Sequence, residues 1–255
     1  MVGVGVTGQK GDYHPYLATA AHNVRRAQDS ASPLLIRYNT TDGGSVVEET
    51  TTNWYFHPDP AVDLAVLPFD PPASYEVGLI PAETFAFDEL LEKHYFGTGD
   101  EVMAVGLFYF RHGKKRNLPV LRSGIVASMP TEPFIDDHTG APYDAYLIEM
   151  RSFGGLSGTP IFTVIHEGSL LNRPGRVFSP LVHRLTLVGV VRGHWDVKAS
   201  GPSADAEIEQ ANIGLTIATP AQKLAELLLE PELCRLRRKD EAAMPPISEA
   251  DPPSA

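Results

Sequence analysis

Short apolar runs separated by turn-forming residues recur throughout the first 219 positions. In the first part of the chain they fall at residues 2–6, 16–19, 34–38, 46–48, 54–57 and 64–67. In the second part they fall at residues 102–108, 120–128, 145–150, 160–165, 185–192 and 212–218. Runs of this length, bounded by glycine, proline and aspartate, are typical of strands joined by turns. The pattern therefore predicts an all-β barrel or sandwich architecture.

Three changes in the pattern divide the chain. Residues 73–98 follow the Pro71-Pro72 pair and contain Pro81 and an acidic amphipathic piece, and we interpret them as a linker between an N-terminal β-barrel at 1–72 and a C-terminal β-barrel at 99–219. Residues 220–238 change to helical spacing, with leucines recurring along one stripe. Residues 239–255 contain two Pro-Pro pairs and few large apolar side chains, so they predict a disordered tail.

Charge and composition exclude several classes of function. The chain has 21 Lys and Arg against 32 Asp and Glu, a net charge of −11, which repels phosphate backbones and predicts no nucleic-acid partner. Its single cysteine, Cys234, allows neither an internal disulfide nor a multi-cysteine zinc site. The nine histidines show no HExxH pattern, so no metal and no cofactor are expected.

No segment of the sequence predicts a membrane or export function. The longest apolar stretches, such as residues 185–191, fall far short of the roughly 20 residues that a spanning helix needs. The first residues lack the basic region and the cleavage site of a signal peptide. We therefore expect a cytoplasmic protein with no membrane partner.

A histidine and an aspartate each stand at the end of a predicted strand. The short apolar run at residues 16–19 ends in small residues followed by His22, which presents the imidazole at the strand end. Asp63 directly precedes the apolar run 64–67, so its carboxylate lies at the start of a predicted strand. A carboxylate in that position can accept an imidazole N–H and set the tautomer that a histidine base requires.

A serine lies within a glycine-rich stretch, residues 152–160. Glycines on both sides of Ser157 let the backbone bend sharply and expose the hydroxyl. The amides of Gly155 and Ser157 can then form an oxyanion hole, worth about 2.7–4 kcal/mol per donor. A phosphate-binding loop is the rival interpretation, but no GK[ST] follows and the next element reads as a strand.

The order histidine, aspartate, serine, 41 and 94 residues apart, resembles the catalytic triad of the chymotrypsin-like (trypsin-like) serine peptidases. The family's Thr-Ala-small-His, Asp-(Ile/Leu)-Ala and Gly-X-Ser-Gly-small-Pro motifs match residues 19–22, 63–65 and 155–160. The resemblance covers about residues 1–219. It implies two six-stranded antiparallel β-barrels, here followed by the C-terminal helix, with the triad between the barrels.

The resemblance also implies an activity. It predicts a serine endopeptidase that cleaves protein or peptide substrates through an acyl-enzyme on Ser157. His22 acts as general base, Asp63 orients its ring, and the amides of Gly155 and Ser157 bind the oxyanion.

By the same resemblance the substrate pocket has its floor near Arg151 and its wall along Val191, Arg192 and Gly193. Two arginines at this place favour an acidic substrate side chain. Alternatively, both point to solvent and balance the acidic surface.

The chain departs from the family pattern in several places. Leu156 stands where the animal digestive members keep an activating aspartate, and the family's disulfides are missing, as in the bacterial and viral branches. Thr159 replaces a common glycine. Only two strands precede His22, near Val2 and Tyr16, where the family has three. The first strand of the N-terminal barrel is therefore either upstream of this sequence or missing, which would leave an edge open or covered by another element.

Two other functions remain open on the sequence. The incomplete N-terminal barrel favours a catalytically silent scaffold that binds proteins, because catalysis needs geometry good to about 1 Å. A hydrolase acting on esters rather than peptides would use the same residues.

Overall fold

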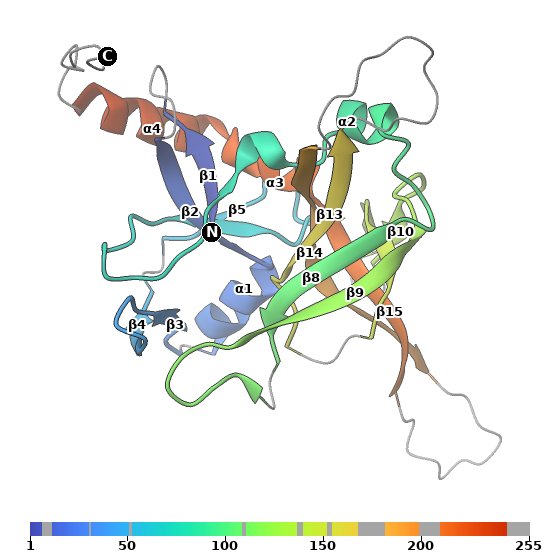
Figure 1. The fold of residues 1–255 in the computed structure, drawn as a ribbon, viewed down its shortest axis with the longest axis horizontal. Helices are drawn as coiled ribbons and strands as arrows, with labels where there is room; N and C mark the ends of the chain where they lie inside the picture. The colour runs from blue at the N-terminus through green and yellow to red at the C-terminus, as the bar shows by residue number, and fades with distance from the viewer. Residues whose placement is uncertain are drawn as a thin grey trace.

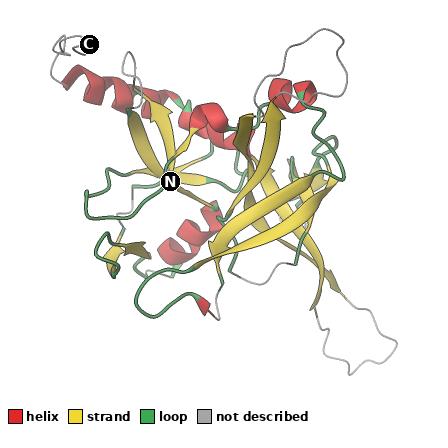
Figure 2. Cartoon of the chain, in the orientation of Figure 1, coloured by secondary structure: helices red, strands yellow, loops and turns green. Residues whose placement is uncertain are grey.

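The computed structural model describes residues 1–6, 12–30, 32–50, 53–108, 111–136, 140–151, 155–167, 182–198 and 210–243. These residues form a mostly β structure in two units, with the C-terminal helices lying over the N-terminal unit (Figure 1). Figure 2 shows the same arrangement by type of element, with long strands dominating the second unit and strands, helices and loops sharing the first. The predicted β class is therefore confirmed.

The strands of the second unit close into a six-stranded antiparallel barrel. Their order around it is β12 (Tyr146–Glu149), β15 (Gln210–Pro220), β14 (Val182–Lys198), β13 (Pro160–Glu167), β8 (Glu101–Leu107) and β9 (Pro119–Ser128). Burial alternates along β8, where Val102 and Ala104 face the core while Glu101 and Val105 are exposed. This is the period of a strand with one face on a core, and it confirms one of the two predicted barrels.

The first unit is built from shorter strands. Its five-stranded sheet has the order β5 (Tyr55–Phe56), β6 (Ala65–Pro68), β2 (Tyr13–Thr19), β1 (Val2–Gly5) and β7 (Ile80–Pro81), whereas β3 (Leu35–Asn39) and β4 (Ser45–Glu49) pair with each other. Among the described residues, the strand pairings of this unit do not show the second closed barrel that was predicted. Both edge strands are two residues long, and β7 pairs with β1 through only two residues, so few ladder hydrogen bonds are available to close the sheet.

Two helices, rather than the one predicted at residues 220–238, follow the barrel. Helix α3 spans Ala221–Leu228 and helix α4 spans Pro231–Ala243. The break precedes Pro231, which lacks a backbone N–H and is therefore suited to the first turn of a new helix. Helix α4 continues into the predicted tail, and residues 244–255 lie outside the described part of the chain.

These helices cover the open N-terminal sheet. Leucines of α3 and α4 and apolar residues of β1 and β2 belong to one buried cluster, with Val2, Tyr16, Leu224, Leu227, Leu228 and Leu233 among its members. Arg237 of α4 is only 7% exposed and donates from Nη1 to the Tyr16 hydroxyl at 2.9 Å. The helices therefore bury the sheet face that a closed barrel would otherwise enclose.

The segment between the units is ordered and packed. It contains β7, the 3₁₀-helix η1 (Ala82–Thr84) and helix α2 (Asp88–Lys93). Phe85 is fully buried and bridges to Leu187 of β14, and the Ala86 amide donates to the Leu187 carbonyl at 2.8 Å. The segment predicted as a linker therefore packs against the barrel through these contacts.

Candidate active site

Strand pairing brings His22 and Asp63 together. Thr19 of β2 faces Ala65 of β6 in antiparallel register, so the residues that follow Thr19 and precede Ala65 leave the sheet at the same end. The Nδ1 atom of His22 lies 2.6 Å from Oδ2 of Asp63. Asp63 is 7% exposed, so its carboxylate makes this contact largely out of reach of solvent.

His22 lies in a helix that the sequence did not reveal. The sequence predicted only that His22 follows the end of a strand, whereas the structure places it second in helix α1 (Ala21–Asp29). The first amides of a helix have no partner within it, and Ala20 at the N-cap has no side-chain acceptor. The His22 amide instead donates to Asp63 Oδ1 at 2.8 Å. One carboxylate therefore holds both the ring and the main chain of His22, and its negative charge suits the helix N-terminus.

The electrostatics of this pair favour an ionised Asp63. Burial raises the pKa of the Asp63 carboxyl, but hydrogen bonds from the His22 ring and amide and the charges of His22 and Arg192 lower it by more, so it lies below its ordinary value of 3.8. Because a carboxylate only accepts hydrogen bonds, the proton of the neutral imidazole is assigned to Nδ1. The Nε2 atom of His22 is then the proton acceptor.

The low pKa of Asp63 predicts a loss of stability in acid. As pH falls, the unfolded chain protonates Asp63 near 3.8 while the folded chain still keeps it ionised, so acid favours unfolding. The contribution of Asp63 to the unfolding free energy is therefore fully present above 3.8 and is lost as pH falls through the folded pKa. Urea unfolding between about pH 5 and pH 2 should show a shallower pH dependence for Asp63→Asn than for the wild type.

The exposed Glu149 of β12 provides the control for that measurement. Glu149→Gln should keep the wild-type pH dependence. If the curves of Asp63→Asn and the wild type stay parallel across this range, the interaction between Asp63 and His22 does not contribute to stability.

The loop of Ser157 packs directly against the strand end that leads to His22. Gly155 and Gly158 adopt φ values of +92° and +89°, which side chains other than glycine rarely tolerate. A Cβ atom at Gly158 would lie 2.5 Å from Thr19 Oγ1, so only glycine allows this approach. The Asn23 side chain donates to the Ser157 carbonyl at 3.2 Å. The predicted sharp bend around the serine is present, and residues 152–154 of the motif lie outside the described residues.

The hydroxyl of Ser157 has a partner other than the histidine. Its Oγ atom donates to the Arg192 carbonyl at 3.0 Å. No hydrogen bond joins Ser157 Oγ to His22 within the described part of the chain. The structure thus places the serine loop beside the His22–Asp63 pair while the hydroxyl is directed at strand β14.

The two backbone amides predicted to bind the oxyanion, those of Gly155 and Ser157, form no hydrogen bond with the described residues. The amides that flank this bend are engaged, because Gly158 donates to the Val191 carbonyl at 2.8 Å and Thr159 to the Leu156 carbonyl at 2.9 Å. Two amides near a left-handed turn are therefore available to a bound oxygen.

The four predicted pocket residues differ in their surroundings. Arg151 is exposed, and its carbonyl accepts from Arg122 at 2.6 Å. Val191 is buried, and its amide donates to the Thr159 carbonyl at 2.9 Å. Gly193 is half-buried. Arg192 neither faces solvent freely nor stands unpaired, because its guanidinium forms an ion pair of 2.7 Å with Asp136.

Sequence reasoning missed three residues around the site. Asn23 follows His22 directly, and its amide group contacts both the Ser157 carbonyl and Thr19 Oγ1, each at 3.2 Å. Its position next to the histidine was the one available signal. Asp136 and Tyr143 approach through Arg192, and no local pattern in the sequence marks them.

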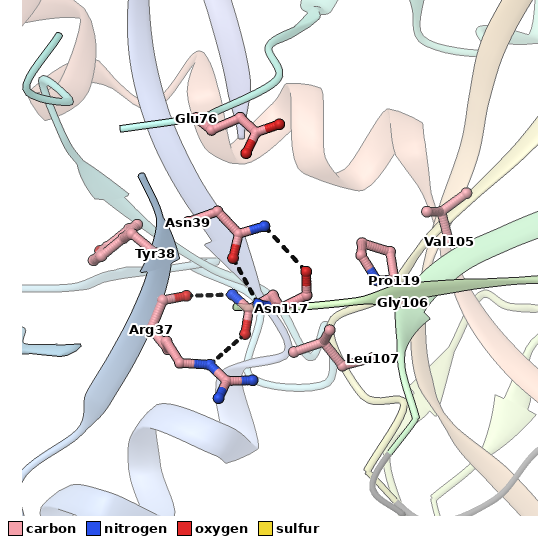
Figure 3. Close-up of a pocket in the computed structure, with 9 residues that line it drawn as sticks. All are labelled: Arg37, Tyr38, Asn39, Glu76, Val105, Gly106, Leu107, Asn117 and Pro119. Carbon is pink, nitrogen blue, oxygen red and sulfur yellow. Dashed lines mark hydrogen bonds between the residues drawn. The ribbon is translucent and has the colours of Figure 1, made fainter. Parts of the chain in front are cut away.

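A cavity of about 310 Å³ lies away from this site, between β3 and the β8–β9 hairpin (Figure 3). It is lined by Arg37, Tyr38, Asn39, Glu76, Val105, Gly106, Leu107, Asn117 and Pro119. Asn39 Nδ2 donates to the Asn117 carbonyl at 3.1 Å, and the Asn117 amide donates back to Asn39 Oδ1 at 2.6 Å (Figure 3). None of the predicted site residues lines it, so it belongs to the contact between the two units.

The part of the chain that the structure describes was compared with the requirements of a metal cluster and of a membrane-spanning helix. It contains no group of three or more His, Cys, Asp or Glu side chains placed to hold a metal ion. Among its helices, none combines the length and the apolar character needed to cross a bilayer.

Neither protein-family models nor curated protein sequences match this chain. Among solved structures, the chain is similar to the MamO protease domain from Magnetospirillum magneticum in its apo form, at 16% sequence identity and a TM-score of 0.45. The alignment covers 89% of this chain and 94% of that one. At this TM-score the similarity adds nothing to what the geometry of His22, Asp63 and Ser157 supports.

Proposed function

We propose that this chain is a serine endopeptidase that cleaves peptide bonds of protein or peptide substrates through an acyl-enzyme on Ser157. The observation that supports the proposal best is the 2.6 Å contact of His22 Nδ1 with the buried Asp63 carboxylate. This contact prepares Nε2 of His22 as a base at the place where the glycine-flanked serine loop packs.

In the proposed reaction, Ser157 Oγ attacks the carbonyl carbon of the substrate while His22 Nε2 takes its proton. Asp63 stabilises the resulting imidazolium, and the amides of Gly155 and Ser157 bind the negative oxygen. His22 then protonates the leaving amine, and water hydrolyses the acyl-enzyme by the same steps in reverse order.

The reaction requires the Ser157 hydroxyl to leave the Arg192 carbonyl and turn toward His22. Rotation about one side-chain bond is fast compared with turnover, on the ps–ns timescale for accessible side chains. Catalytic hydrogen bonds are often formed fully only with substrate present. The observed hydroxyl position is therefore compatible with the proposed mechanism.

The predicted preference for acidic substrate side chains can no longer rest on both arginines. Arg192 is already neutralised by Asp136, so its charge is not available to a substrate carboxylate. Arg151, by contrast, is exposed. If the pocket selects acidic side chains, we propose that Arg151 is the residue responsible.

A catalytically silent scaffold is the second candidate, and one observation favours it. The Ser157 hydroxyl donates to the Arg192 carbonyl rather than to the histidine, and a serine held there is not activated. The two functions therefore differ in whether Ser157 becomes nucleophilic.

Labelling with a fluorophosphonate separates the two candidates, because the reagent reacts with activated serines. A peptidase should be labelled stoichiometrically, with the adduct mapped to Ser157 by mass spectrometry. The Ser123→Ala variant, which changes an exposed serine of β9, should be labelled like the wild type. Folded protein that remains unlabelled would establish the silent scaffold.

A further inference from the structure

Arg192 joins three segments that are far apart in the sequence. Its Nη1 donates to the Ala61 carbonyl at 2.7 Å, and its Nη2 donates to Asp136 Oδ2 at 2.7 Å. Its guanidinium carbon also lies 4.0 Å from the centroid of the Tyr143 ring. Only 19% of the Arg192 side chain and 18% of the Asp136 side chain are exposed. Hydrogen bonds to a charged donor in such a screened position are stronger than those at an open surface.

The Ala61 carbonyl belongs to the segment that carries Asp63. Residues 61–64 are each at most 8% exposed. The Ala61 amide is held by Asp59 Oδ1 at 2.9 Å, which completes the turn that precedes the segment. The Ala61 carbonyl is held by Arg192. The main chain two residues before Asp63 is therefore fixed on both sides, once from its own turn and once from the barrel.

Strand β14 connects this contact to the serine. The Arg192 carbonyl accepts the Ser157 hydroxyl, and the neighbouring Val191 carbonyl accepts the Gly158 amide. The same short stretch of β14 therefore contacts the segment of Asp63 through a side chain and the loop of Ser157 through main-chain carbonyls. It spans the two units at the point where the proposed reaction needs them aligned.

The chemistry of this contact suits arginine specifically. A guanidinium carries donors in a planar fork, so it can reach a carbonyl and a carboxylate while its face lies on an aromatic ring. A lysine has one nitrogen and no flat face, so it could not make these three contacts at once. Burial raises the pKa of Asp63, and the contacts with His22 lower it. The positive charge of Arg192 adds a smaller lowering effect.

We propose that Arg192 is a positioning residue of the proposed peptidase, holding the Asp63 segment against the barrel so that the His22–Asp63 pair stays aligned with Ser157. The inference rests on the proposed function and replaces the predicted role of Arg192 as a receptor for acidic substrates. Asp136 and Tyr143 hold the guanidinium through the ion pair and the ring contact.

The first test follows Asp63 in the free protein by ¹³C NMR of its carboxyl group. Arg192→Met and Arg192→Gln both remove the charge, and the glutamine keeps an amide donor for the Ala61 carbonyl. Both should move the Asp63 titration midpoint upward. Arg37→Met is the matched control, because Arg37 also links the two units through the carbonyls of His112 and Gly113, at 2.8 and 3.0 Å, yet is not among the charges that act on Asp63. It should leave the midpoint unchanged.

The second test measures peptide hydrolysis by the same variants. Arg192→Met should lower kcat by about 10²-fold with KM nearly unchanged, as expected for a misplacement near 1 Å. Arg192→Gln should show a smaller decrease in kcat than Arg192→Met. If the methionine variant does not fold, the kcat of the glutamine variant tests the proposal. An unmoved Asp63 midpoint in the folded variants, or full kcat despite a moved midpoint, would overturn the proposal. A wild type without hydrolysis would refute the peptidase alone, because the midpoint still reports whether Arg192 acts on Asp63.

Discussion

Ser157→Ala is expected to lower kcat for peptide hydrolysis by about 10⁶-fold, because removing the nucleophile disables a triad that acts as a unit. The residual rate should come from substrate binding and from the amides of Gly155 and Ser157, which the substitution keeps. Initial rates on a mixed peptide library measure the effect whichever residue precedes the cleaved bond.

The fold should survive this substitution. The variant loses one hydrogen bond, from Ser157 Oγ to the Arg192 carbonyl, worth about 1 kcal/mol. Thermal unfolding should therefore stay close to that of the wild type, and Ser123→Ala should keep full activity. Hydrolysis by Ser157→Ala at a rate close to that of the wild type would remove Ser157 from the mechanism.

Asp63→Asn is expected to lower kcat by about 10⁴-fold through the tautomer of His22. The His22 amide requires an oxygen acceptor, so the carboxamide oxygen of the variant takes the place of Oδ1. Its NH₂ group then faces Nδ1, which lies 2.6 Å from Oδ2 in the wild type. Because Nδ1 must now accept, the ring proton moves to Nε2, and Nε2 can no longer take a proton from Ser157.

Rates and ¹⁵N chemical shifts of the His22 ring measure the two parts of this prediction separately. Asp42→Asn is the matched control, since Asp42 is a turn aspartate that accepts the Gly44 amide at 3.0 Å and makes no hydrogen bond with His22. It should keep both the rate and the tautomer. An Asp63→Asn variant that retains the wild-type tautomer and rate would show that the carboxylate has no part in the chemistry.

The strands of the barrel and the pairing of His22 with Asp63 were accessible from the sequence for a physical reason. Alternating burial along a strand such as β8 leaves a period in the sequence, and the two triad residues flank strands that pair directly. Helix α1 was missed because its nine residues bury only Ala21 and Val24, which is too few to show a helical period.

Features that depend on distant partners left no local signal. The strands at the two edges of the first sheet, β5 and β7, are each two residues long and too short to show a period in the sequence. The contacts of Arg192 join residues 131 and 56 positions apart, at Ala61 and Asp136. Only the packed molecule brings these groups together, so the role of Arg192 was predicted from its place in a motif and not from its neighbours.

The cover provided by α4 has a consequence for the order of folding during synthesis. Tyr16 meets Arg237 across 221 positions of the chain. The N-terminal sheet therefore emerges from the ribosome long before the residues that shield its apolar face, and such long-range contacts form slowly. Until translation reaches α4, that face lacks the side chains of Leu233 and Arg237 that cover it in the folded molecule, and removal of α4 by a protease would expose it again.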